Sequence, residues 1–212
     1  MKNVAGYDLS RLQAGAFGTV GVLLDVSLRV RAAPEVTRIQ VLEVGLGAAL
    51  EHMIRFGRRP WPLTGLAWVD GRLYVRLAGA AEGVAAAALE VGGEEAPEDG
   101  FFERLRDLRL ETLTGDEAPL WRLSVPFDAP RADFPGNWVI DWGGAQRWCV
   151  TETDPARVCA AARSLGGHAM RRRPALLRTP PASAVAALET RVRAALDPAG
   201  VLNPGVMDAE VD

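Results

Sequence analysis

Side chains that act as nucleophiles or metal ligands are scarce in this sequence. Its 212 residues include only two histidines, His52 and His168, and two cysteines, Cys149 and Cys159. The histidines stand far apart and form none of the short metal-binding motifs, such as HExxH. The cysteines lie in apolar or alanine-rich segments, where a thiol packs as a small hydrophobic group. We therefore predict no metal site and assign no catalytic residue, and only His168, at the start of a strand, stays open as a residue facing a cleft.

Other motifs that carry chemistry are also missing or ambiguous. The sequence has no GxSxG, GxxxxGK[ST] or complete GxGxxG pattern. Its six tryptophans are spread over strand-like segments beside aliphatic residues, which is more typical of a core than of a stacking surface. The run Arg171–Arg173 stands at a strand end and favours a solvated edge, with an anion site as the alternative.

Two glycine- and asparagine-rich segments near the ends are more specific. The first reads KNVAGYDL over residues 2–9 and continues with Gly18-Thr19-Val20-Gly21 at the entry to a strand. It resembles the closing part of a PCMH-type FAD-binding domain, the flavin fold of the vanillyl-alcohol oxidase family. The second, Leu202–Gly205, follows a helix and resembles the C-terminal flavin-contacting motif of FAD-linked oxidases.

Three internal motifs extend the resemblance over nearly the whole sequence. They are Leu123–Pro126, the DWGGAQRW segment of residues 141–148, and Gly166–Ala169. All three look like the FAD-binding subunit of bacterial glycolate oxidases. In that family an earlier half of the FAD domain carries the pyrophosphate loop. We therefore expect a C-terminal portion of such a subunit, lacking that half.

The resemblance implies a set of flavin-binding residues. Small side chains let the main chain approach a flat ring closely, glycines let a strand entry pass beside the ribityl or adenosine part, and polar groups bond the ring edge. The implied FAD-binding residues are Asn3, Val4, Ala5, Gly6, Gly18, Thr19, Gly21, Val22, Gln146, Arg147 and Asn203. For Arg147 a solvated strand position is the alternative. We further expect Asn203–Gly205 to fold back toward Asn3–Gly6.

The resemblance also implies a function. It indicates a subunit of an FAD-dependent oxidoreductase that oxidises a small 2-hydroxy acid by hydride transfer to FAD. The expected partners are a homologous FAD-containing catalytic subunit and an Fe–S subunit. A non-catalytic assembly subunit that docks these partners is one alternative, and a free-standing ferredoxin-like ligand-binding module is another. Whether the chain is an enzyme by itself stays open.

Composition excludes several classes of protein function. The 24 basic and 27 acidic residues give a net charge of −3, so no excess positive field attracts nucleic acid. Two cysteines are too few for an Fe–S cluster or a cysteine-rich zinc site within this chain. No apolar run reaches the roughly 20 residues of a membrane helix, and no signal peptide follows Met1. We expect a cytoplasmic protein, peripheral to the inner membrane only through partner subunits.

Two stretches of sequence predict the same order of elements. The first has a strand at 37–43, a helix at 46–56, a hairpin of 63–69 and 72–78 around Asp70-Gly71, a helix at 80–90 and a short strand at 94–96. The second has a strand at 120–125, a hairpin of 137–141 and 147–151, a helix from Asp154-Pro155 to Leu165, and a strand at 168–173. Its first crossover helix shrinks to the proline-broken segment 127–135. We interpret this as a duplicated βαββαβ unit.

The predicted fold class is α+β: the end of a PCMH-type FAD-binding domain, followed by a ferredoxin-like cap domain with an antiparallel sheet. The expected domains are 1–33, the cap at 34–180, and a C-terminal helix with its tail at 181–212. Alternation between Thr19 and Val30 predicts a further strand. We expect one continuous sheet with helices on one face, a connecting helix at 103–113 and a last helix at 183–196.

Overall fold

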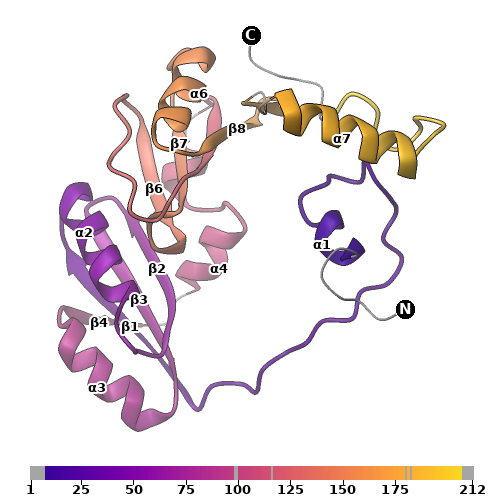
Figure 1. Ribbon diagram of the computed structural model, residues 1–212. Helices are drawn as coiled ribbons and strands as arrows, with labels where there is room; N and C mark the ends of the chain where they lie inside the picture. Colours follow the sequence, from indigo (N-terminus) through magenta and orange to yellow (C-terminus); the bar gives the residue numbers. More distant parts are fainter. Residues whose placement is uncertain (1–7, 98–99, 116, 180, 182, 207–212) are drawn as a thin grey trace. The chain divides into compact units, whose positions relative to one another are not determined.

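The computed structural model describes residues 8–97, 100–115, 117–179, 181 and 183–206. They form two compact units (Figure 1). One unit spans Arg31–Ala175 and holds the sheet. The other, the terminal unit, consists of the described residues up to Val30 together with those from Leu176 onward. Segments from the two ends of the sequence therefore fold together.

The first half of the sheet follows the predicted order. Its elements are β1 (Val36–Glu43), α2 (Leu46–Gly57), β2 (Leu63–Val69), β3 (Arg72–Gly79), α3 (Ala81–Val91) and β4 (Glu94–Ala96). The strands lie in the order β4-β1-β3-β2. Asp70 and Gly71 both have positive φ, 50° and 82°, as a tight two-residue hairpin turn requires. The hairpin predicted from this dipeptide is confirmed.

The second half repeats that arrangement. Its elements are β5 (Leu120–Ser124), β6 (Asn137–Asp141), the 3-10 turn η1 (Trp142–Gly144), β7 (Gln146–Val150), α6 (Pro155–Ser164) and β8 (His168–Arg173). Their order, β6-β7-β5-β8, is the first half's order read from the other end, and β2 pairs with β6. The duplicated βαββαβ order and the continuous antiparallel sheet are confirmed. Asp154 accepts hydrogen bonds from the amides of Ala156 and Arg157 and so begins α6 as predicted.

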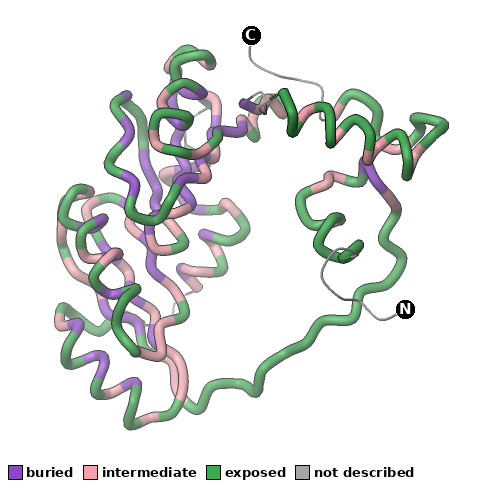
Figure 2. The backbone as a smooth tube through the Cα atoms, in the orientation of Figure 1, coloured by how far each residue is buried: buried purple, intermediate pink, exposed green. Residues whose placement is uncertain are grey.

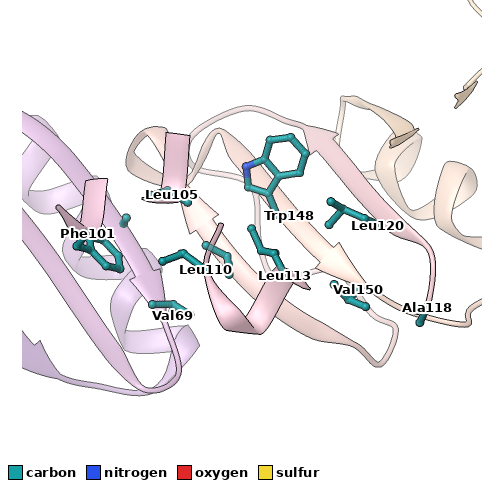
Figure 3. Packing of buried hydrophobic residues seen from close by; sticks show 11 residues of the cluster. Val69, Phe101, Leu105, Leu110, Leu113, Ala118, Leu120, Trp148 and Val150 are labelled. Carbon is teal, nitrogen blue, oxygen red and sulfur yellow. The ribbon is translucent and has the colours of Figure 1, made fainter. Parts of the chain in front are cut away.

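The connection between the halves differs from the prediction. Instead of one helix at 103–113 the chain forms α4 (Phe101–Arg106) and α5 (Glu111–Thr114). The helix breaks because Leu108 takes a positive φ of 56°. This break lets Phe101, Leu105, Leu110 and Leu113 bury against Val69, Leu120, Trp148 and Val150 (Figure 3).

These two short helices lie on the opposite face of the sheet from α2 and α3. The alternation along β3 separates the faces, since Tyr74 stacks on Phe101 of α4 while its neighbours Leu73 and Val75 are fully buried on the other side. The expectation of helices on one face is therefore wrong. The crossover helices share a face, but the linker covers the other because the sheet is apolar on both sides.

The terminal unit contains α1 (Leu9–Gln13), β9 (Leu177–Arg178) and α7 (Ser183–Leu196). Its α7 helix was predicted with these bounds, but the strand predicted within 19–30 is wrong. Residues 22–30 are exposed (Figure 2) and pair with no other strand in the described chain. Leu24 is 94% exposed. Alternation sets which side chains share a face, but a strand also needs a second strand to bond its main chain.

No helix within the described residues is long and apolar enough to cross a membrane.

Candidate functional site

One contact in the terminal unit joins residues 186 positions apart. The Nδ2 of Asn203 donates a hydrogen bond of 2.7 Å to the carbonyl oxygen of Phe17. Both residues have positive φ, 43° for Asn203 and 52° for Phe17, and Gly18 follows at 72°. The bond to Phe17 places Asn203 beside Gly18, so two of the segments implied in flavin binding, 18–22 and 202–205, lie together.

Side chains from other segments lie close to both glycines in the first of these segments. A Cβ on Gly18 would stand 2.8 Å from Asn203 Nδ2, and one on Gly21 would stand 2.7 Å from Gln13 Nε2. Thr19 is buried, and its hydroxyl donates to the Ala16 carbonyl at 2.7 Å, so this side chain holds the loop. Val22 and Asn203 are exposed. Asn3, Val4, Ala5 and Gly6 lie outside the described residues, and so does the expected contact between them and Asn203–Gly205.

A small cleft adjoins this cluster within the terminal unit. It has a volume of about 270 Å³ and lies between residues 12–20 and α7. Its walls are mostly apolar, with Leu12, Val20 and Leu188 on opposite sides and Glu189 and Arg193 as charged members. Glu189 also accepts from both terminal nitrogens of Arg178 at 3.1 Å, which anchors α7 to the segment before it.

In the sheet unit, Gln146 lies in a cleft of about 480 Å³ beside α4. The charged residues of this cleft are Arg76, Glu103, Arg106 and Asp141. Asp141 accepts from the Trp142 amide at 2.7 Å and from Gln146 Nε2 at 3.5 Å. Burial raises the pKa of the Asp141 carboxyl, partly offset by these bonds and by Arg76.

Asp141 was not among the residues singled out from the sequence. The available signal was its position directly before the turn of the DWGGAQRW motif, where an aspartate commonly bonds nearby amides. Next to it, Trp142 is 70% exposed with a φ of 52°. Trp142 lines both this cleft and a second one of about 420 Å³ on the α2 side.

Arg147 lies on the other face from Gln146, because neighbours in a strand point to opposite sides. Its side chain is 1% exposed and donates to three carbonyl oxygens, those of Gly144 (2.9 Å), Ala129 (2.5 Å) and Pro130 (2.5 Å). Burial lowers the pKa of this guanidinium. The alternative of a solvated strand position is wrong. The structure does not bring Gln146 and Arg147 together, and their contact with a flavin stays a prediction.

The two cysteines and the two histidines are the side chains considered as nucleophiles or metal ligands. Cys149 and Cys159 are buried, and desolvation raises the pKa of the Cys149 thiol to about 12. His52 Nδ1 bonds Arg55, while burial lowers the pKa of both His52 and the exposed His168. Within the described ranges no three His, Cys, Asp or Glu side chains gather as a metal site.

Comparison with known proteins gives one informative relative. No family model matches the chain. It is 40% identical over 214 aligned residues to the glycolate oxidase subunit GlcE of Escherichia coli (strain K12), and the match covers all of this chain. The resemblance to a glycolate oxidase subunit is confirmed. The chain spans 60% of the length of GlcE.

The similarity to GlcE includes every segment described above. Because it runs the whole length of the chain, it covers the Phe17–Gly21 loop, the Asp141–Trp148 hairpin and Asn203 alike. The sheet unit and the terminal unit are therefore both parts of one GlcE-like sequence.

Proposed function

We propose that this chain forms part of an FAD-linked glycolate oxidase subunit, in which the cluster of Phe17, Gly18 and Asn203 borders the flavin. The observation that carries the proposal is the Asn203–Phe17 hydrogen bond in a chain 40% identical to GlcE. It joins two motifs that were each assigned to flavin contact on sequence grounds. Chance proximity is a poor explanation for two motifs 186 positions apart.

The residues of this cluster fit one edge of a flavin. A Cβ on Gly18 would meet Asn203 Nδ2 and one on Gly21 would meet the end of the Gln13 side chain, and the absence of a Cβ lets the main chain at both positions approach a flat ring. The Phe17 bond uses the Nδ2 donor of Asn203, so it leaves the amide's Oδ1 acceptor for a ring N–H. The Thr19 hydroxyl already donates to the Ala16 carbonyl, so Thr19 would contact the flavin through its main chain. Val22 would also contact it through its main chain.

FAD, when bound, would accept the hydride equivalent removed from a small 2-hydroxy acid. The contribution of this chain would be to orient the flavin and to exclude water from the edge that Asn203 covers. Gln146 lies in a polar cleft of the sheet unit, and we propose it as a further contact to the cofactor or substrate. On this proposal the protein works in the cytoplasm, and its partner subunits, one FAD-containing and one with an Fe–S centre, hold it at the inner membrane.

Flavin retention tests the proposal. The chain is incubated with FAD, alone and with the other subunits of glycolate oxidase, and flavin absorbance is measured after desalting. Retained flavin that is lost in Asn203→Ala is the expected result. Asn137→Ala is the matched control, because Asn137 is also an exposed asparagine but begins β6 in the sheet unit. Absence of flavin under both conditions, or equal loss in both variants, would contradict the proposal.

A non-catalytic assembly subunit is the second candidate, and the exposed segment 22–30 favours it. Val22, Leu24, Val26, Leu28 and Val30 alternate along this extended segment and are 57–94% exposed. An apolar alternating face of this kind is suited to pairing with another polypeptide. Co-purification with the catalytic subunit, without flavin retained by this chain, would favour this candidate over the first.

A further inference from the structure

The cleft of about 480 Å³ beside α4 lies where the two halves of the sheet meet, and it is called the seam cleft below. β2 of the first half pairs with β6 of the second. The first half supplies Arg76 of β3 to the walls, and the second half supplies Asp141 and Gln146 of the β6–β7 hairpin. Residues of α4 form a further wall. The seam cleft therefore forms only when both halves pair in one sheet.

Three contacts hold the guanidinium of Arg76 in the seam cleft. Its Nε donates to the Thr64 hydroxyl at 3.2 Å, and its Nη2 donates to the Thr64 carbonyl oxygen at 3.3 Å. The guanidinium carbon also lies 4.5 Å from the ring centroid of Phe102. Phe102 has space there because Gly65 stands opposite Arg76, and a Cβ on Gly65 would lie 2.6 Å from the ring. These contacts leave Nη1 of Arg76 for a ligand.

The positive charge of Arg76 has no carboxylate partner within the described chain. Arg106, the other cation of the seam cleft, is paired with Asp107 at 2.8 Å. Glu103 and Asp141 also line the cleft, and neither of these described residues forms an ion pair with Arg76. Because guanidinium groups bind carboxylates through parallel hydrogen bonds, a fixed and unpaired Arg76 is suited to the carboxylate of a ligand.

Asp141 is suited to a hydroxyl group of the same ligand. It stands directly opposite Gln146, so both side chains point to one face. Its bonds from the Trp142 amide and from Gln146 leave acceptor capacity on the two carboxyl oxygens. Burial raises the pKa of this carboxyl. A hydroxyl matches the carboxyl in either protonation state because it both donates and accepts, whereas an ammonium group only donates and needs the charged form.

The remaining walls of the seam cleft are largely apolar. They include Leu66, Phe102, Leu105, Trp142 and Trp148. Leu105 and Trp148 belong to the buried cluster of Figure 3, so packing holds these two walls in place. Clefts of roughly 300–1,000 Å³ hold ligands of drug size, and a two-carbon acid would fill only a small part of this one. A fitting ligand therefore carries an apolar group in addition to its polar groups.

We propose that the seam cleft binds a 2-hydroxy acid with an apolar or aromatic side chain. Its carboxylate would bond Nη1 of Arg76, its hydroxyl would bond Asp141, and its side chain would lie against the leucine and tryptophan walls. The placement of acid and hydroxyl on adjacent carbons rests on the proposed function. The seam cleft and its polar groups are argued from the sheet unit alone.

Isothermal titration calorimetry on the full chain without FAD tests the proposal with three probes. These are phenyllactate, 3-phenylpropanoate, which lacks the hydroxyl, and glycolate, which lacks the aromatic group. Phenyllactate is expected to bind at least about tenfold more tightly than either of the others. Arg76→Gln should weaken phenyllactate binding at least about tenfold. Arg72→Gln is the matched control, since Arg72 is on the same strand, changes the net charge equally and does not line the seam cleft.

A second variant tests the hydroxyl contact. Asp141→Ala should reduce the preference for phenyllactate over 3-phenylpropanoate to less than about threefold, because only the hydroxyl distinguishes the two acids. Circular dichroism checks that each variant is folded. The preference is also measured on the native chain, so the test does not depend on a variant that fails to fold.

Several outcomes would overturn the proposal. They are no binding of phenyllactate, equal binding of phenyllactate and 3-phenylpropanoate by the native chain, tighter binding of glycolate, and equal weakening in Arg76→Gln and Arg72→Gln. A chain that retains FAD but does not bind phenyllactate contradicts this inference alone. A chain that binds phenyllactate but retains no FAD contradicts only the proposed function.

Discussion

The two halves of the sheet have the same strand order but connect their first two strands differently. In the first half α2 makes the connection, and in the second half the irregular segment from Val125 to Gly136 does. The second residue of the strand that follows each hairpin turn, β3 or β7, shows the consequence. In the first half it is Leu73, and in the second half it is Arg147, and both are essentially fully buried.

This difference follows from main-chain hydrogen bonding. A helix bonds its own amides and carbonyls, so its neighbour in the sheet needs only to be apolar, as Leu73 is. An irregular segment leaves carbonyls without partners, and burying them unpaired is costly. Arg147 donates to the carbonyls of Ala129 and Pro130, and Thr151 donates its hydroxyl to that of Pro135 at 2.7 Å. Buried side-chain donors thus replace the missing helix.

The largest effect is expected when Arg147 of the second half is replaced by leucine, the residue type at the equivalent position, Leu73, of the first half. Arg147→Leu should lower the free energy of unfolding by about 3 kcal/mol, because the carbonyls of the buried residues Gly144 and Ala129, and that of Pro130, lose their donor. Chemical denaturation followed by circular dichroism measures it. Arg131→Leu, at an exposed position of the same segment, should change stability by no more than about 0.5 kcal/mol. An Arg147→Leu variant with the stability of the native chain would show that the segment from Val125 to Gly136 does not depend on Arg147.

A smaller effect is expected where the irregular segment meets the sheet. A Cβ on Gly136 would stand 2.3 Å from Cys149 Sγ and 2.9 Å from the Val150 carbonyl, so Gly136→Ala should cost about 1–3 kcal/mol. Gly83→Ala in α3 is the matched control. No atom lies within 4 Å of the corresponding Cβ, and alanine in a helix interior should add about 0.5–1 kcal/mol. Thermal unfolding of both variants tests the contrast, and equal shifts would refute it.

The smallest effect concerns the two histidines, one in each half. Burial lowers the pKa of His52 and His168 below the ordinary 6.5, so the folded state binds their protons less well than the unfolded chain. Their contribution to stability is therefore present above pH 6.5 and is lost as the pH falls below it. Denaturation midpoints between about pH 7 and 5 should decline, and less so in His168→Gln and His52→Gln. A midpoint that rises on acidification would contradict the assigned directions.

Local sequence was sufficient for most elements and for the strand order. The Asp70-Gly71 turn, the Asp154-Pro155 helix start and the apolar spacing in α2 each depend on residues within a few positions, which is why pattern predicts them. The family resemblance likewise rests on short motifs, and it is confirmed by the similarity to GlcE. The same patterns could not show that the linker breaks at Leu108, because that break goes with packing of the linker against a buried face of the sheet.

Only the tertiary structure decided which residues meet. Alternation predicted a strand in 19–30, but a strand must pair with a second segment. The periodicity of one segment does not show which other segment it pairs with. The DWGGAQRW motif placed Gln146 and Arg147 side by side, and the pleat of β7 sends them to opposite faces. Asn203 reaches Phe17 across 186 positions through one amide, and such a contact leaves no local pattern. Sequence fixes local conformation because its causes are local, whereas long-range contacts depend on how separate elements pack.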